Sequence, residues 1–311
     1  MRIGDFSEQE LRENLLGSGL KIHLGPFTTR IRADGPPAIY RQILQLNADH
    51  RVAGADAIAD FHVEVASPRG VRRWLRPQVR FYDDQFVPFE PLPAFMALAA
   101  LEWGINWCIG NRANQYLMLH AAVVERDGLA AVFPASPGHG KTTLCAGLMH
   151  SGWRLLSDEF GLVQPLTSTI VPLPRLLPLK NQSVDVIRAF SEDAVLGPTF
   201  PKTKKGDVAH LKPTTESVHR SSETAQARLI VFPRWRLGAR LELTPMLKSQ
   251  AFLALATNAF NYEVLGETAF RTVDQMVSSC DCYRLVYSNL SEAVAALSEL
   301  AAKLGGEGGA Q

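Results

Sequence analysis

The stretch Phe133-Pro134-Ala135-Ser136-Pro137-Gly138-His139-Gly140-Lys141-Thr142-Thr143 decides the fold of this chain. It fits the pattern Gly-x-x-x-x-Gly-Lys-Ser/Thr at Gly140, Lys141 and Thr142, with Ala135 in place of the first glycine. An apolar strand is expected over 129–133 and an apolar helix over 142–149, which is the context that the pattern requires. The stretch therefore predicts a phosphate-binding loop between a strand and a helix, in preference to an ordinary turn.

The residue types in this loop suit a nucleotide. Gly138 and Gly140 let the backbone approach a phosphate closely, and the loop and the following helix point N–H groups at it. Lys141 supplies a positive charge for the β- and γ-phosphates, and the Thr142 hydroxyl can ligate Mg²⁺. We expect ATP and Mg²⁺ to bind, with contacts to the nucleotide from Ser136, Pro137, Gly138, His139, Gly140, Lys141, Thr142 and Thr143.

A pair of carboxylates follows the loop along the chain. The segment Gly152-Trp153-Arg154-Leu155-Leu156-Ser157-Asp158-Glu159 places Asp158 and Glu159 at the end of a short apolar strand. Beside a phosphate loop, such a pair can bind Mg²⁺, and one member can accept a proton from an attacking hydroxyl. A solvated acidic turn is the alternative, which the neighbouring loop makes less favoured.

Other polar residues are candidates for the same site. His120 lies in the otherwise apolar strand expected over 116–124. Arg175, Lys180 and Arg234 are candidates to stabilise the charge that develops on a transferred phosphoryl group, and a structural ion pair is the equally open alternative for each of them.

Composition and charge narrow the class of protein. The 311 residues are 46% hydrophobic and 20% charged, and the net charge is +1, so nothing in the overall charge favours nucleic acid or an anionic membrane as a partner. The four cysteines do not suggest a disulfide framework. No targeting segment is recognised, and the apolar stretch 94–109 contains Glu102 and Asn106 and predicts a buried helix. We expect a cytoplasmic protein.

The chain is expected to have three parts. Residues 1–93 predict an α+β region, with a hairpin over 21–31 and two strands over 73–89; residues 94–304 predict the phosphate-loop domain; and the tail 305–311 has no means of ordering itself. The later elements are expected to be helices over 181–190, 248–260, 267–279 and 290–304 and strands over 227–232, 240–243 and 282–287.

Residues 197–226 are polar and predict a long mobile loop. Its basic part, 201–213, contains Lys202, Lys204, Lys205 and Lys212. This part is expected either to close over the triphosphate or to be an ordinary solvated surface loop.

The three site elements together resemble the catalytic domain of the HPr kinase/phosphorylase family. The resemblance rests on His120-Ala121-Ala122-Val123-Val124, on the loop ending Gly-Lys-Thr-Thr and on the segment 152–159. The chain is still more similar to HprK-related kinase A, through 102–107, 172–181 and 231–235. The resemblance covers about residues 94–300 and implies an α/β fold: a P-loop kinase domain of the HPr kinase/phosphoenolpyruvate carboxykinase type, here with an N-terminal α+β region.

The resemblance also implies roles for individual residues. Asp158 takes the place of the catalytic base, His120 that of the histidine that tunes it, and Glu159 that of a metal-site carboxylate. The family's segment Glu-Ile-Arg-Gly is replaced by Leu173-Pro174-Arg175-Leu176, which lacks its metal-site glutamate. Thr142, Asp158 and Glu159 are then the expected Mg²⁺ ligands, and Lys141 and Arg234 complete the expected catalytic set.

The resulting hypothesis is an ATP-dependent kinase that phosphorylates a serine or threonine hydroxyl. The resemblance implies a peptide or small-protein acceptor, with a PqqD-like peptide chaperone as a candidate partner. It leaves the oligomeric state open, because no interface residues can be matched to those of the hexameric HPr kinases. Two alternatives remain: an ATP-sensing module that recruits such a chaperone without phosphotransfer, and a small-molecule kinase.

Overall fold

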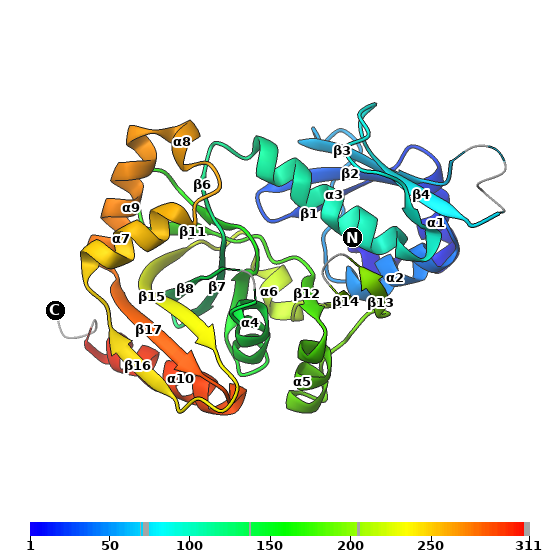
Figure 1. The fold of residues 1–311 in the computed structure, drawn as a ribbon. Coiled ribbons are helices and arrows are strands. Elements are labelled where there is room, and N and C mark those ends of the chain that lie inside the picture. Colours follow the sequence, from blue (N-terminus) through cyan, green and yellow to red (C-terminus); the bar gives the residue numbers. More distant parts are fainter. Residues whose placement is uncertain (69, 71–74, 137, 204–205, 308–311) are drawn as a thin grey trace.

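The computed structural model describes residues 1–68, 70, 75–136, 138–203 and 206–307. Within these residues the chain forms a mixed α/β fold with three β-sheets (Figure 1). One sheet belongs to the N-terminal region, a large sheet follows the middle of the chain, and a small sheet lies beside helix α4 (Lys141–Met149).

The N-terminal sheet has the strand order β1-β2-β3-β4-β5, in which only β2 and β3 pair in parallel. The expected hairpin over 21–31 is confirmed, because β1 and β2 pair antiparallel and turn between Leu24 and Phe27. Of the two strands expected over 73–89 the structure has one, and residues 71–74 lie outside the described part. The strands are β1 (Leu20–Leu24), β2 (Phe27–Asp34), β3 (Phe61–Ala66), β4 (Gln78–Asp83) and β5 (Leu92–Pro93).

Helices cover this sheet. The apolar stretch 94–109 forms the short 3-10 helix η3 (Ala94–Met96) and then α3 (Ala97–Arg112). Helix α3 packs on β3 and β4 and shares one hydrophobic core with the N-terminal strands. Gly104 permits this contact, because a Cβ there would lie 2.0 Å from the ring of Phe81. The remaining elements are η1 (Ile3–Asp5), α1 (Glu8–Leu16) and α2 (Ala38–Leu46).

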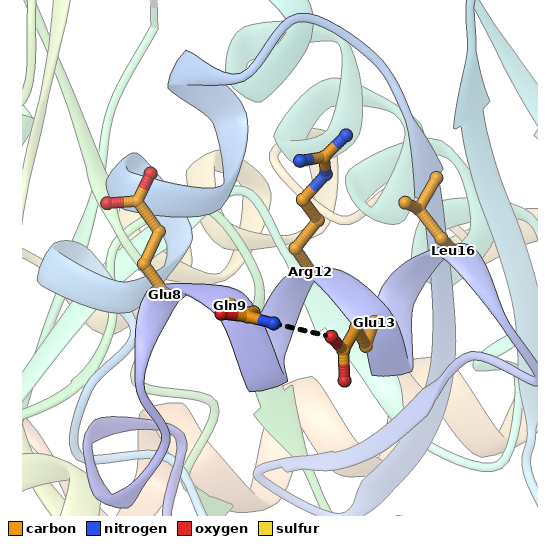
Figure 2. A pocket seen from close by; sticks show the side chains of 5 residues that line it. All are labelled: Glu8, Gln9, Arg12, Glu13 and Leu16. Carbon is orange, nitrogen blue, oxygen red and sulfur yellow. Dashed lines mark hydrogen bonds between the residues drawn. The ribbon is translucent and has the colours of Figure 1, made fainter.

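Helix α1 has a largely polar outer face. Ser7 and Glu10 form a capping box at its start. Figure 2 shows the shallow hollow along this face, where the Gln9 amide donates a hydrogen bond to Glu13 at 3.0 Å. The lining side chains all come from this one helix, so the hollow is a solvated helix face.

The large sheet has the strand order β6-β10-β11-β15-β8-β7-β9, with β17 paired to β15 and β16 paired to β17. Apolar side chains of its central strands alternate between two cores, one under α4 and α10 (Leu290–Glu307) and one under α7 (Lys248–Thr257) and α9 (Glu267–Ser279). A sheet covered on both faces explains why these strands are apolar along almost their whole length. The strands are β6 (Leu117–Leu119), β7 (Ala121–Arg126), β8 (Leu129–Pro134), β9 (Arg154–Ser157), β10 (Gly161–Val163), β11 (Thr169–Val171), β15 (Ala225–Trp235), β16 (Glu242–Pro245) and β17 (Asp281–Tyr287).

The strand directions bring distant segments to one edge of this sheet. Strand β15 is parallel to β8 and β17, and β7 is antiparallel to both β8 and β9. The carboxyl ends of β8, β9, β15 and β17 therefore lie at the same edge, together with the start of β7. The strand expected over 116–124 is interrupted at His120, so that β6 and β7 are separate strands with different neighbours.

The expectation of a long mobile loop over 197–226 is wrong for the residues that the structure describes. They form β13 (Phe200–Thr203), β14 (Gly206–Leu211), α6 (Thr215–His219) and the start of β15. Strand β14 lies between β13 and β12 (Leu177–Lys180) in the small sheet, beside α5 (Gln182–Phe190). Pairing to β12 supplies long-range hydrogen bonds that the polar local sequence does not reveal. Lys204 and Lys205 lie outside the described residues.

The helices expected over 248–260 and 267–279 and the strand expected over 282–287 are confirmed, and the short helix α8 (Tyr262–Leu265) is an addition. The strand expected over 240–243 is displaced to Glu242–Pro245. Helix α10 continues past the expected end at 304 to Glu307, so that the first three residues of the tail expected over 305–311 are helical. In the part of the chain that the structure describes, no helix combines the length and apolar character needed to span a bilayer.

Candidate functional site

The loop expected to bind phosphate, residues 135–140, joins β8 to α4. Strand β8 ends at Pro134 and α4 begins at Lys141, and the described residues between them are Ala135, Ser136, Gly138, His139 and Gly140. Pro137, which was expected to contact the nucleotide, lies outside the described residues. The backbone at Gly138 and Gly140 has φ angles of 87° and 83°, which glycine adopts without strain.

Two residues from β15 and β17 fix the end of this loop. The Trp235 backbone N–H donates to the His139 carbonyl oxygen at 3.1 Å, and the Tyr287 hydroxyl donates to the Gly140 carbonyl oxygen at 3.1 Å. A Cβ at Gly140 would lie 2.5 Å from the Tyr287 hydroxyl oxygen. Gly140 is therefore required both by its backbone angle and by the close approach of β17.

Lys141 is buried in the first turn of α4, with only 9% of its surface exposed. Its ammonium nitrogen has no hydrogen-bond partner among the described residues. Burial lowers the pKa of Lys141, although the nearby Asp158 and Glu159 carboxylates oppose this shift. A buried cation without a hydrogen-bonding partner is costly, so this position suits an anionic ligand.

Asp158 follows β9 and is 6% exposed. Its Oδ2 atom accepts a hydrogen bond from the Thr142 hydroxyl at 3.0 Å, and its Oδ1 atom is buried without a partner among the described residues. Burial raises the pKa of Asp158 to about 6, against the opposing charge of Lys141. The carboxylate is thus mostly ionised at neutral pH and poised to accept a proton.

Glu159 is connected to the N-terminal region through α3. Its Oε2 atom accepts a hydrogen bond from the Asn106 amide at 2.5 Å, and Asn106 in turn accepts one from Arg175. Arg175 also forms a buried ion pair with Glu102 at 2.6 Å. The Arg175 guanidinium is therefore occupied by an ion pair and a hydrogen bond within the protein. A structural ion pair was one of the two expectations for this residue.

Lys180 stands at the end of β12, close enough that its charge affects the pKa values of both Lys141 and Asp158. With Lys141 it gives the acidic pair two neighbouring cations. Lys180, Glu159 and Asn106 also line a cavity of about 400 Å³.

His120 lies just before β7, whose first residue pairs with Pro134 at the end of β8. His120 is therefore at the edge of the sheet that carries the loop. Its backbone N–H donates to the Asn258 carbonyl oxygen at 2.6 Å, and its ring centroid lies 5.2 Å from that of Phe260.

Arg234 is the penultimate residue of β15 and is exposed at the same edge. It directly precedes Trp235, whose backbone binds the loop. The remaining expected nucleotide residues, Thr142 and Thr143, lie in the first turn of α4 and are partly exposed.

The described residues contain no cluster of three or more histidine, cysteine, aspartate or glutamate side chains suited to a metal ion. A Mg²⁺ ion in a nucleotide site needs only one or two protein oxygens, because water and phosphates complete its octahedron. The Thr142 hydroxyl and the Asp158 carboxylate already lie in contact and fit this requirement.

Three site residues were not predicted from the sequence as members of the site: Asn106, Trp235 and Tyr287. For Asn106 a signal existed, because Glu102 and Asn106 are polar residues four apart on an otherwise apolar helix. Nothing in the sequence marks Tyr287, which reaches the loop only through the parallel pairing of β15 and β17.

Comparison of the sequence with protein-family models gives no matching family, and comparison with curated proteins gives no match.

Proposed function

We propose that this chain is an ATP- and Mg²⁺-dependent kinase that transfers the γ-phosphoryl group to a serine or threonine hydroxyl. The observation that carries the proposal is the burial of Lys141, directly after the loop, near Asp158, directly after β9. The Lys141 ammonium nitrogen and Oδ1 of Asp158 are both buried without a hydrogen-bond partner among the described residues.

The residues present fit a nucleoside triphosphate. Phosphate oxygens would satisfy the Lys141 ammonium and the N–H groups at the start of α4, where the helix dipole also favours negative charge. Thr142 and Asp158, with Glu159 beside them, would hold Mg²⁺, which would neutralise phosphate charge when bound.

The proposed reaction uses Asp158 as the general base. The acceptor hydroxyl oxygen forms a bond to the γ-phosphorus as its proton passes to the Asp158 carboxylate. The bond between the γ-phosphorus and the β,γ-bridging oxygen breaks, and ADP leaves. Lys141 offsets the charge on the transferred group, and its burial strengthens that interaction.

His120 and Arg234 have supporting roles in this proposal. Both lie at the carboxyl edge of the sheet that carries the loop. We propose that His120 affects the ionisation of Asp158 and that Arg234 approaches the triphosphate from β15.

The fold type and the acceptor rest on the resemblance to HPr kinase/phosphorylase and HprK-related kinase A. On that basis we propose a P-loop kinase domain of the HPr kinase/phosphoenolpyruvate carboxykinase type and a peptide or small-protein acceptor, with a PqqD-like chaperone as the partner that presents it.

Incubation of the purified protein with γ-labelled ATP, Mg²⁺ and serine-containing peptides tests the proposal. Label on a peptide serine is the expected result. Binding of ATP, measured by calorimetry, without any label on peptide would instead favour the ATP-sensing module. Label on a small hydroxyl compound alone would favour the small-molecule kinase.

A further inference from the structure

The cavity of about 400 Å³ is built by five separate parts of the fold. Helix α3 contributes Trp103, Asn106 and Trp107, and the segment after β9 contributes Glu159 and Phe160. The small sheet contributes Pro178, Lys180 and Val208, and two connecting segments contribute Phe89 and Phe260. Its size and its largely apolar lining with a few polar groups are typical of a ligand site.

The polar side chains that line this cavity, Asn106, Glu159 and Lys180, lie near Asp158, the proposed general base. Glu159 follows Asp158 directly in the chain and accepts a hydrogen bond from Asn106 at 2.5 Å, and both residues line the cavity together with Lys180 at the end of β12. The aromatic groups form the remaining wall. A ligand held among these aromatic rings would therefore lie beside Glu159, the neighbour of Asp158 in the chain.

The aromatic wall is held in place by contacts between its own rings and with residues outside the cavity. The Trp107 ring lies 5.7 Å from Phe86 and 6.3 Å from Phe89, centroid to centroid. The Phe260 ring lies 5.0 Å from Phe160, and the Phe260 backbone N–H donates to the Met118 carbonyl oxygen at 2.8 Å. Preorganised aromatic surfaces of this kind bind large apolar side chains with little loss of conformational entropy.

We propose that this cavity is the acceptor subsite and that it binds a large aromatic side chain within two residues of the phosphorylated serine or threonine. This inference rests on the proposed kinase function. It names the acceptor as a peptide segment in which an aromatic residue adjoins the hydroxyl residue. The short spacing is part of the proposal: Glu159, the residue after Asp158, lines the cavity, and two extended residues span about 7 Å.

Phe260 offers a sharp test because Phe270 is a matched control. The two phenylalanines are 51% and 52% exposed, so truncation of either should cost the fold little. Phe260 lines the cavity, whereas Phe270 packs on Phe252 of α7, with ring centroids 5.1 Å apart, and is not among the residues lining it.

The experiment uses short peptides with one central serine, flanked at each position in turn by Phe, Leu, Ala or Glu. Phosphorylation by the full chain is measured with γ-labelled ATP. Binding is measured separately by fluorescence anisotropy, with labelled peptides in which alanine replaces the serine, in the presence of Mg²⁺ and a non-hydrolysable ATP analogue. The second readout does not depend on transfer.

We expect the wild-type protein to bind the Phe-flanked peptide about tenfold more tightly than the Ala-flanked peptide, which corresponds to about 1.4 kcal/mol. Phe260→Ala should remove most of this preference and leave the affinity for the ATP analogue unchanged, and Phe270→Ala should retain the preference. Retention of the full preference in Phe260→Ala, or its absence from the wild-type protein, would overturn the inference.

The two readouts separate this inference from the proposed function. Transfer to peptides without an aromatic preference overturns the acceptor subsite and leaves the kinase in place. Binding with the aromatic preference but without transfer supports a peptide site in a protein that is not a kinase. If the protein shows no peptide binding and no transfer, both the acceptor subsite and the proposed kinase function are overturned.

Discussion

The Thr142 hydroxyl donates a hydrogen bond of 3.0 Å to Oδ2 of Asp158 across a sequence separation of 16 residues. One residue stands in the first turn of α4 and the other directly after β9, so the bond connects the phosphate loop to the acidic pair. Both oxygens belong to groups that ligate Mg²⁺ well. The fold itself therefore brings these two groups of the candidate site together.

Asp158→Asn should lower the rate of transfer by about 10²–10⁴-fold, because this is the typical contribution of a general base. The asparagine side-chain oxygen still accepts the Thr142 hydrogen bond, so ATP affinity measured without Mg²⁺ should change little. Labelled-phosphate transfer and calorimetric binding of ATP measure the two effects. Asp185→Asn, at an exposed aspartate on α5, is the control. A near wild-type rate in Asp158→Asn would remove the base from the proposed mechanism.

Gly140→Ala should disrupt the loop through two separate effects. A residue with Cβ pays about 1–2 kcal/mol for the left-handed conformation, and its Cβ would lie 2.5 Å from the Tyr287 hydroxyl and 2.9 Å from Cβ of Trp235. We expect the unfolding free energy to fall by about 2 kcal/mol or more and ATP affinity to fall at least tenfold. Denaturant unfolding and calorimetry measure these quantities.

Gly152→Ala is the control for this substitution. Gly152 has a φ of 86°, but a Cβ there has no atom within 4 Å. The backbone cost alone should remain, about 1–2 kcal/mol, with ATP affinity unchanged. Equal losses of ATP affinity in the two variants would show that the contact with β17 has no special importance for the loop.

The turn from β8 into α4 and the position of Asp158 after a short strand could be predicted because local sequence carries them. The loop needs glycines and a lysine at fixed spacing, and an apolar strand that ends in Asp158 can be recognised from a few neighbouring residues. The helices after residue 240 are likewise visible in their local apolar patterns. These elements require little knowledge of distant partners.

Features that depend on distant pairing could not be predicted. Residues 200–211 look like a loop because they contain three lysines, a glycine and a proline, yet β14 is stabilised by β12 and by the burial of Val208, Ala209 and Leu211. The cavity beside Asp158 combines side chains from α3, β12 and β14, and sequence spacing alone does not reveal that these elements meet.

Arg175→Met should destabilise the protein by about 3–5 kcal/mol at neutral pH, because it leaves the buried Glu102 carboxylate without its ion-pair partner. Burial already raises the pKa of Glu102, and a protonated Glu102 needs no cation. The loss should therefore shrink as pH falls. Denaturant unfolding at several pH values measures the effect.

The double variant Glu102→Leu/Arg175→Met completes a thermodynamic cycle. Its loss of unfolding free energy should be smaller than that of Arg175→Met alone, because no buried charge remains unpaired. A double variant that loses as much as the two single variants added together would mean that the ion pair does not couple Glu102 to Arg175.

His210→Leu should make the protein more resistant to acid. Burial, together with the nearby Arg175 charge, lowers the pKa of His210 to about 4, whereas the unfolded chain titrates near 6.5. Between these values the unfolded state binds the proton and the folded state does not, so the unfolding free energy falls as pH drops, by about 3 kcal/mol from this group. The substitution removes this term, and denaturant unfolding at pH 7, 5.5 and 4.5 should give a shallower decline.

His50 provides the comparison within the same molecule. Burial lowers its pKa to about 4 as well, so His210→Leu should retain the share of acid sensitivity that His50 contributes. A combined substitution at both positions should then flatten the dependence further, because two groups that protonate only in the unfolded chain have been removed. A decline between pH 6.5 and 4.5 that is equally steep in the wild-type and His210→Leu proteins would show that His210 does not remain neutral in the folded protein.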